Sequence, residues 1–197
     1  MRLLLACCLL SLAHAPLLAQ ERELDWPSIS VTAHLDADGR LHVSERQVMR
    51  MSGDWNGGER RFDLPFGQEL SLKRILRSDT PDGPARELEQ GDTGNVDHFD
   101  WIDGSTLRWR SRLPTDPPFA NTVLTYTLEF TYSNIIQPED DGTFRLDNDF
   151  AFRDRTGLIH EFNVRLTFDP IWDAGPLFGG VYRATNLVPG EGYVVQV

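Results

Sequence analysis

The stretch Thr122-Val-Leu-Thr-Tyr-Thr-Leu-Glu-Phe-Thr-Tyr132 places a large apolar side chain at every second position. The even positions from Leu124 to Tyr132 are apolar, and the odd positions between them are mostly polar. Successive side chains of a β-strand point to opposite faces, so this period of two predicts a strand buried on one face. We find no convincing apolar stripe with a period of 3.6 residues, so the chain is expected to be all-β.

Similar strand patterns on both sides of this stretch are joined by turn signals. Residues 29–35 and 41–43 alternate in the same way and flank Asp36-Ala-Asp-Gly39, where glycine can adopt a positive φ. Asp103-Gly104 is a second turn signal, between strands expected at residues 98–102 and 105–112. Residues 144–152 and 162–168 are expected to form two antiparallel strands around a turn at residues 153–157.

About nine short strands, with turn signals roughly every 8–15 residues, predict a two-sheet sandwich. The expected fold class is therefore all-β, a single antiparallel β-sandwich of the immunoglobulin-like general type. A chain of 197 residues has room for one ordinary domain, which we place at residues 20–197.

The composition is acidic, with 19 Lys+Arg against 30 Asp+Glu and a formal net charge of -11. So acidic a chain is a poor partner for nucleic acid, because it offers few cations to displace counterions from phosphates. Both cysteines, Cys7 and Cys8, lie near the amino terminus, so residues 20–197 have no disulfide and no thiolate.

The amino terminus has the pattern of a secretory signal peptide. Arg2 is followed by an apolar run from Leu3 to Leu12 and then by small residues up to Ala19. His14 and Pro16 interrupt the run, which is too short to be a membrane anchor. We therefore expect residues 1–19 to be a signal peptide cleaved after Ala19, and the mature chain to be exported to the periplasm or the extracytoplasmic face of the envelope.

The order of several short motifs resembles the family called domain of unknown function 2207. These motifs are Asp38-Gly-Arg-Leu-His-Val-Ser-Glu45, Trp55-Asn-Gly-Gly-Glu-Arg-Arg-Phe-Asp-Leu-Pro65, Leu107-Arg-Trp109 and the strand from Tyr126 to Asn134. The resemblance implies an extracytoplasmic all-β region of a bacterial membrane protein. Family members usually continue into transmembrane helices, and this chain shows no such continuation. The family supplies no established activity.

The best candidate binding residues are Trp55, Arg60 and Arg61. Trp55 lies in Gly53-Asp-Trp-Asn-Gly-Gly58, where a flat aromatic side chain could stack on a sugar or anchor a partner's side chain. Arg60 and Arg61 follow and could pair with Asp63 or with a carboxylate of a ligand. The alternative, which we favour for Trp55, is a tryptophan folded back to close the end of the sandwich.

Other polar residues give weaker signals. Calcium could bind the acidic residues, but a solvated strand face explains them more simply; the residues are Glu139, Asp140, Asp141, Asp147, Asn148, Asp149 and Asp154. His34 and His42 flank the first hairpin without a third ligand, so we expect no metal and no cofactor. Nucleophile and metalloprotease motifs are absent from the sequence.

These observations favour a non-catalytic binding or interaction domain of the envelope, with an envelope protein or a glycan as partner. The alternatives are a secreted or periplasmic hydrolase acting on envelope carbohydrate, through paired carboxylates, and a calcium-stabilised structural module.

Overall fold

A computed structural model describes residues 21–65, 67–173 and 180–197. These residues form strands and no helix, which confirms the all-β prediction. The strands are β1 Glu23–Leu35, β2 Leu41–Gly53, β3 Gly57–Arg61, β4 Glu69–Ser78, β5 Arg86–Glu87, β6 Glu89–Gln90, β7 His98–Trp101, β8 Thr106–Arg110, β9 Phe119–Ser133, β10 Ile136–Pro138, β11 Phe144–Asp149, β12 Ile159–Phe168, β13 Gly180–Leu187 and β14 Val194–Gln196.

The largest sheet has seven strands in the order β13-β12-β1-β2-β9-β4-β5. β1 and β2 form the expected hairpin, with Gly39 at a φ of 78° in the turn. β2 then pairs antiparallel with β9, the strand whose alternation is clearest in the sequence. On its other edge β1 pairs with β12 in parallel, from Trp26 opposite Ile159 to Leu35 opposite Phe168.

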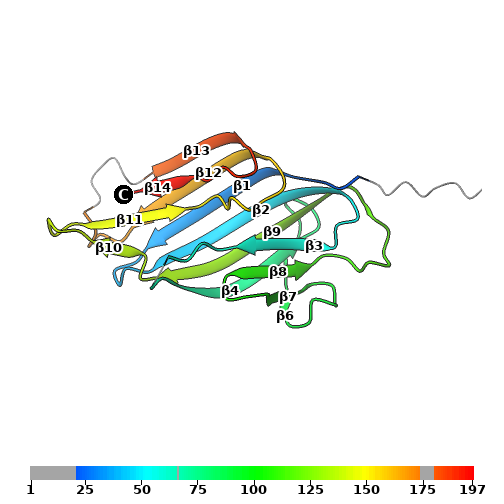
Figure 1. The fold of residues 1–197 in the computed structure, drawn as a ribbon, viewed down its shortest axis with the longest axis horizontal. Coiled ribbons are helices and arrows are strands. Elements are labelled where there is room, and N and C mark those ends of the chain that lie inside the picture. The colour runs from blue at the N-terminus through cyan, green and yellow to red at the C-terminus, as the bar shows by residue number, and fades with distance from the viewer. Residues whose placement is uncertain (1–20, 66, 174–179) are drawn as a thin grey trace, which may run out of the picture.

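Two smaller sheets cover one face of the large sheet. One has the order β3-β8-β7-β6 and the other the order β10-β11-β14. Figure 1 shows them side by side in front of the large sheet, so the molecule has two layers and the front layer is divided. The opposite face of the large sheet is polar where β1 and β2 cross it, as expected for a sheet with one solvated face.

The core lies between the two layers. Phe62 and Trp109, on or beside the four-stranded sheet, meet Phe130 and Tyr126 of β9 with ring centroids 5.1 Å apart in both pairs. At the other end, Tyr193 packs on Phe162 of β12 at 5.2 Å. Trp109 is buried in this core and Trp101 packs against it.

The structure corrects two predictions about strand pairing. The strands at residues 144–149 and 159–168 are not partners: β11 pairs with β10 and β14, whereas β12 pairs with β1 and β13. The fold is also not purely antiparallel, because the β1–β12 pair is parallel, and the large sheet faces two sheets rather than one. Alternation along a strand reports which face is buried, not which strand lies beside it.

Candidate functional site

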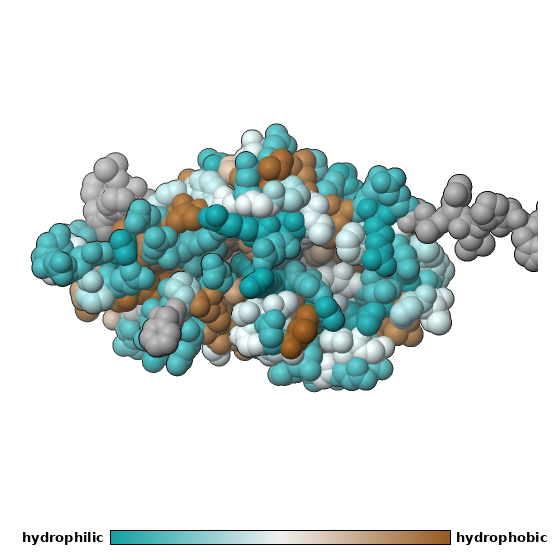
Figure 2. All heavy atoms as spheres, viewed as in Figure 1, coloured by the Kyte–Doolittle hydropathy of each residue, from teal (hydrophilic) through white to brown (hydrophobic). Residues whose placement is uncertain are grey.

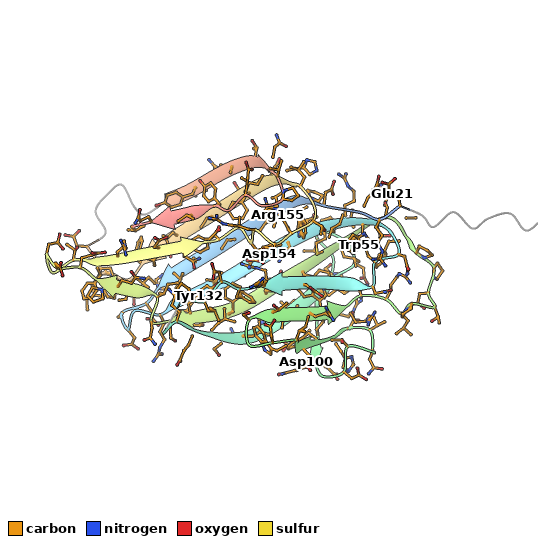
Figure 3. All side chains as sticks on the ribbon, in the orientation of Figure 1. Glu21, Trp55, Asp100, Tyr132, Asp154 and Arg155 are labelled. Atoms are coloured by element: carbon orange, nitrogen blue, oxygen red, sulfur yellow. The ribbon has the colours of Figure 1, made fainter. Side chains whose placement is uncertain are left out.

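A groove lies between the four-stranded sheet and the segment that follows β11, where the front layer is divided. It has a volume of about 740 Å³, within the range typical of ligand pockets. One wall is β3, and the other is the segment at residues 152–156 that leads from β11 to β12. Figure 3 places Asp154 between the ribbons of β11 and β3, and Trp55 at the end where the chain enters β3. We call this feature the central groove.

The central groove is cationic although the chain is acidic. Five arginines line it against two acids; the arginines are Arg22, Arg61, Arg108, Arg110 and Arg155, and the acids are Glu59 and Asp154. Both acids are already paired, Asp154 with Arg61 at 3.1 Å and Glu59 with Arg108. Figure 2 shows mostly hydrophilic residues over the middle of this face. Positive charge therefore remains after the local ion pairs are counted.

Beneath the groove the core contains a chain of buried polar side chains. The Trp26 indole Nε1–H donates to Gln47 at 2.9 Å, and the Gln47 amide donates to Glu45 at 2.6 Å. Arg60 reaches Glu45 from β3, with Nη2 and Oε2 3.1 Å apart. Burial opposes the charge of Arg60, but the neighbouring Glu45 carboxylate, together with Tyr132 and Asp149, outweighs this effect and raises the pKa of Arg60. Buried charges persist only when they are paired in this way.

The three candidate binding residues have different environments. Trp55 lines the groove half-buried, packs against the core, and donates its Nε1–H to the Glu23 carbonyl oxygen at 2.9 Å. Arg61 also lines the groove and its side chain is 63% exposed, so it can meet a ligand. Arg60 does not line the groove. Its guanidinium is enclosed by Phe62 and Phe152, each with its ring centroid 4.6 Å away.

The expected pairing of Arg60 or Arg61 with Asp63 is wrong. Arg60 pairs with Glu45 of β2, and Arg61 pairs with Asp154 of the opposite wall. Adjacent residues of a strand point to opposite faces, so the two arginines separate into one buried and one exposed role. Because Arg60 and Arg61 are adjacent in the sequence, we considered both as binding residues, but strand geometry leaves only Arg61 on the groove.

Arg108, Arg110 and Trp109 are groove residues that the sequence reasoning did not single out as binding residues. Arg108 and Arg110 alternate with Leu107 and Trp109 along β8, and that pattern was the available signal of a cationic strand face. Gly58 lies over Trp109, and a Cβ there would come within 2.4 Å of the indole ring. Glycine is therefore required at this position for the Trp109 indole to lie across β3.

Three residues that line the groove have a buried polar side-chain atom without a hydrogen-bond partner in the part of the chain that the structure describes. These atoms are Trp109 Nε1, Arg155 Nε and Asn56 Oδ1. Buried polar groups in proteins are nearly always hydrogen-bonded, so such a concentration is informative. Two potential donors and one acceptor gather around the same groove.

Three of the acidic residues considered as calcium ligands, Asp141, Asp149 and Asp154, have other partners. Asp149 bonds Arg153 at 2.8 Å and accepts the Tyr193 amide at 2.6 Å, while Asp154 pairs with Arg61. The hydroxyl and amide of Thr143 bond Asp141, and these bonds lower the pKa of its carboxyl group. Across the described ranges, no group of three or more His, Cys, Asp or Glu side chains is arranged to hold a metal ion.

His34 and His42 are cross-strand neighbours in the β1–β2 hairpin. Each ring contacts a threonine hydroxyl and an aspartate: Thr167 and Asp169 for His34, and Thr131 and Asp36 for His42, at distances of 2.8 to 3.1 Å. The two side chains are partly exposed and do not line the central groove. They tie neighbouring strands together on the solvent face of the large sheet.

Comparison with known proteins identifies the family of this two-layer domain. Residues 25–193 match the family described as "Predicted membrane protein (DUF2207) N-terminal domain". The match spans most of the chain, so the chain belongs to this family, which confirms the resemblance found in the sequence. Among curated proteins nothing matches.

Solved structures include a crystal structure described as a "putative protease" from Parabacteroides distasonis ATCC 8503. It is 11% identical, with a TM-score of 0.48, and the similarity covers 88% of this chain. The chain spans 40% of that protein's length. In the portion of this chain for which the structure gives positions, no helical segment has the length and apolar character needed to cross a bilayer. Residues 1–19, predicted as a signal peptide, lie outside the described residues.

Proposed function

We propose that this protein is a non-catalytic binding domain on the extracytoplasmic side of the envelope, and that its ligand occupies the central groove. Membership of a family of membrane-protein N-terminal domains and the signal-like amino terminus support the location. The observation that carries the binding role is the groove itself, with its excess of arginine.

The arrangement of the carboxylates supports binding rather than hydrolysis. A glycosidase needs two carboxyl groups that face the substrate, one to donate a proton and one to act as nucleophile or base. In the central groove Glu59 and Asp154 are each held by an arginine, from β8 and β3 respectively. Both carboxylates are therefore engaged by guanidinium groups of this chain instead of facing the open groove as a free pair.

Capture of envelope components by the purified protein tests this proposal. The immobilised protein is incubated separately with solubilised envelope proteins and with soluble peptidoglycan fragments. Arg61→Glu places a carboxylate in the groove beside Asp154, and we expect it to reduce capture about tenfold or more, on the scale of lost interface ion pairs. Trp55→Ala is expected to weaken capture by about 2 kcal/mol, the usual scale of an aromatic anchor.

Arg165→Glu is the matched control. Arg165 is exposed on β12 and does not line the groove, and its substitution makes the same change in net charge. We expect this variant to capture the same material as the unaltered protein. Equal capture by Arg61→Glu and Arg165→Glu would show that the groove is not the binding site, and no capture by the unaltered protein would contradict the binding role.

A further inference from the structure

The edge of β3 that borders the central groove is an open strand edge. β3 is the terminal strand of its sheet and pairs only with β8. The Phe62 amide donates to the Ser105 carbonyl at 2.8 Å, and the Ser111 amide donates to the Asn56 carbonyl at 2.7 Å. Residues that bond the neighbouring strand alternate with residues that point away, so Gly57, Glu59 and Arg61 direct their backbone groups away from β8.

This open edge has the features of a site for strand addition. Gly57, Glu59 and Arg61 all line the groove, and within the described ranges no other strand pairs with β3 on that side. The Arg61 carbonyl accepts a bond from the Arg60 side chain, so the backbone groups of Gly57 and Glu59 are the ones left for pairing. Glycine at positions 57 and 58 leaves the first part of the edge free of side chains. Exposed edges present a row of unpaired N–H and C=O groups, which is a template for another extended chain.

The charge of the groove indicates what kind of chain would bind there. Arg110 donates to the Thr93 carbonyl oxygen at 2.6 Å, and Arg155 donates to the carbonyl oxygens of Phe152, Val188 and Glu191. Neither guanidinium has a hydrogen-bonded carboxylate among the residues the structure describes. Carboxylates bond guanidinium groups strongly, so Arg110, which is only partly buried, can still accept an acidic side chain, whereas Arg155 is enclosed and adds positive charge beneath the groove.

We propose that the ligand of the central groove is an extended acidic peptide segment of a partner protein, which binds as an additional strand along β3. This inference rests on the proposed function and specifies its ligand. β3 has five residues, so the segment spans about 17 Å at the usual rise of a strand. Backbone groups of Gly57 and Glu59 would supply the pairing, and Arg110 would select the acidic side chains. A glycan could meet the arginines and tryptophans but could not continue the strand ladder.

Binding of defined peptides tests the inference. The probe is a fluorescent acetyl-(Glu-Val)3-amide peptide, compared with the (Lys-Val)3 peptide, the (Glu-Val)3 peptide N-methylated on its backbone amides, and oligogalacturonate as an acidic glycan. We expect the acidic peptide to bind. Both the basic and the N-methylated peptides should bind about tenfold more weakly or worse, because one loses the charge match and the other the ladder hydrogen bonds.

Two substitutions at one position separate the backbone from the side chain. Glu59→Pro removes the open-edge N–H while leaving the bonds to β8 intact, a position where proline is tolerated in edge strands. We expect it to bind the acidic peptide about tenfold more weakly than Glu59→Ala, which makes the same change in charge and keeps the N–H. Far-UV circular dichroism checks that both variants fold. Hydrogen exchange at the Gly57 and Glu59 amides of the unaltered protein should slow when the peptide binds.

The inference is overturned if the acidic peptide does not bind, or if the N-methylated acidic peptide binds as well as the unmethylated one. It is also overturned if oligogalacturonate binds more tightly than the acidic peptide. If Glu59→Pro fails to fold, the test of strand addition rests on the binding of the N-methylated peptide and on hydrogen exchange at the Gly57 and Glu59 amides. The envelope capture experiment remains a separate result. Capture that Arg61→Glu abolishes, without binding of the acidic peptide, would leave the binding function standing and reject strand addition.

Discussion

Arg60 and Glu45 form a buried ion pair in the interior beneath the groove. Both side chains are almost fully enclosed, with exposures of 4% and 1%. Gln47 and Trp26 continue the hydrogen bonds into the core, and the Arg61 carbonyl accepts a further bond from Arg60. A buried ion pair adds little net stability compared with apolar residues, but removing one partner leaves a charge without compensation.

Arg60→Met should therefore destabilise the protein by about 3–5 kcal/mol, because it leaves Glu45 buried and unpaired. The double variant Glu45→Leu/Arg60→Met removes both charges and should be less destabilised than Arg60→Met alone. Chemical denaturation of the two variants and of the unaltered protein measures these differences. A double variant that is less stable than Arg60→Met would show that the pair itself contributes net stability.

At the scale of elements, β1 is the strand on which the large sheet is organised. It pairs with β2 on one edge and with β12 on the other, although β12 follows more than a hundred residues later in the chain. Asp25 at its beginning joins all three strands: Arg50 of β2 donates to Oδ1 at 3.0 Å, and His160 of β12 lies 3.1 Å from Oδ2. This carboxylate therefore connects a local hairpin to a distant strand.

The junction at Asp25 predicts a dependence of stability on pH. Burial opposes ionisation of Asp25, but the hydrogen bonds from Arg50 and His160 outweigh it and lower the pKa below the ordinary value of 3.8. A carboxyl group with a lowered pKa in the folded state stabilises the protein above the unfolded-state pKa, and this contribution is lost as the pH falls through the folded-state pKa. Acidification below about pH 4 should thus weaken the β1–β2–β12 junction.

Asp25→Asn tests this dependence. The variant should be less stable at neutral pH by up to about 1 kcal/mol, the scale of a partly exposed ion pair, and should lose less stability on acidification. Asp82→Asn is the control, because Asp82 is exposed and has no ion pair within the described ranges. Denaturation curves between neutral pH and about pH 3 supply the comparison. Parallel curves for the unaltered protein and Asp25→Asn would rule out a contribution from Asp25.

For the whole molecule, the division of the front layer has the largest consequence for function. A continuous second sheet would cover the large sheet and leave no central groove. Instead β3 and β11 belong to different sheets, and the groove opens between β3 and the segment that follows β11, with arginines from β3, β8 and that segment. The placement of this groove on an exported domain is part of the proposed function.

Export of the whole chain can be measured directly. If residues 1–19 are a signal peptide, protein recovered from the periplasm or the outer face of the membrane should begin at or near Gln20. Amino-terminal sequencing of fractionated material gives the answer, and a substitution of Ala19 by a bulky residue should slow the processing. Met1 retained on a cytoplasmic species would contradict the predicted export.

The sequence by itself determined the local features of this protein. Period-two alternation identified β9 and the buried face of most strands, and turn residues identified the hairpin at Gly39 and the turn at Asp103-Gly104. The ordered motifs identified the family. All of these signals lie within a few residues of one another along the chain, where side-chain direction and turn geometry are dictated by neighbours.

Only the tertiary structure decided which strands lie side by side and what they enclose. The parallel pairing of β1 with β12, the burial of Arg60 against Glu45 and the gathering of arginines around the groove all join residues far apart in the chain. An arginine in a strand has the same sequence pattern whether its side chain faces open solvent or the central groove. The packing of the whole core determines which strands are neighbours, and alternation along one strand does not indicate which strand lies beside it.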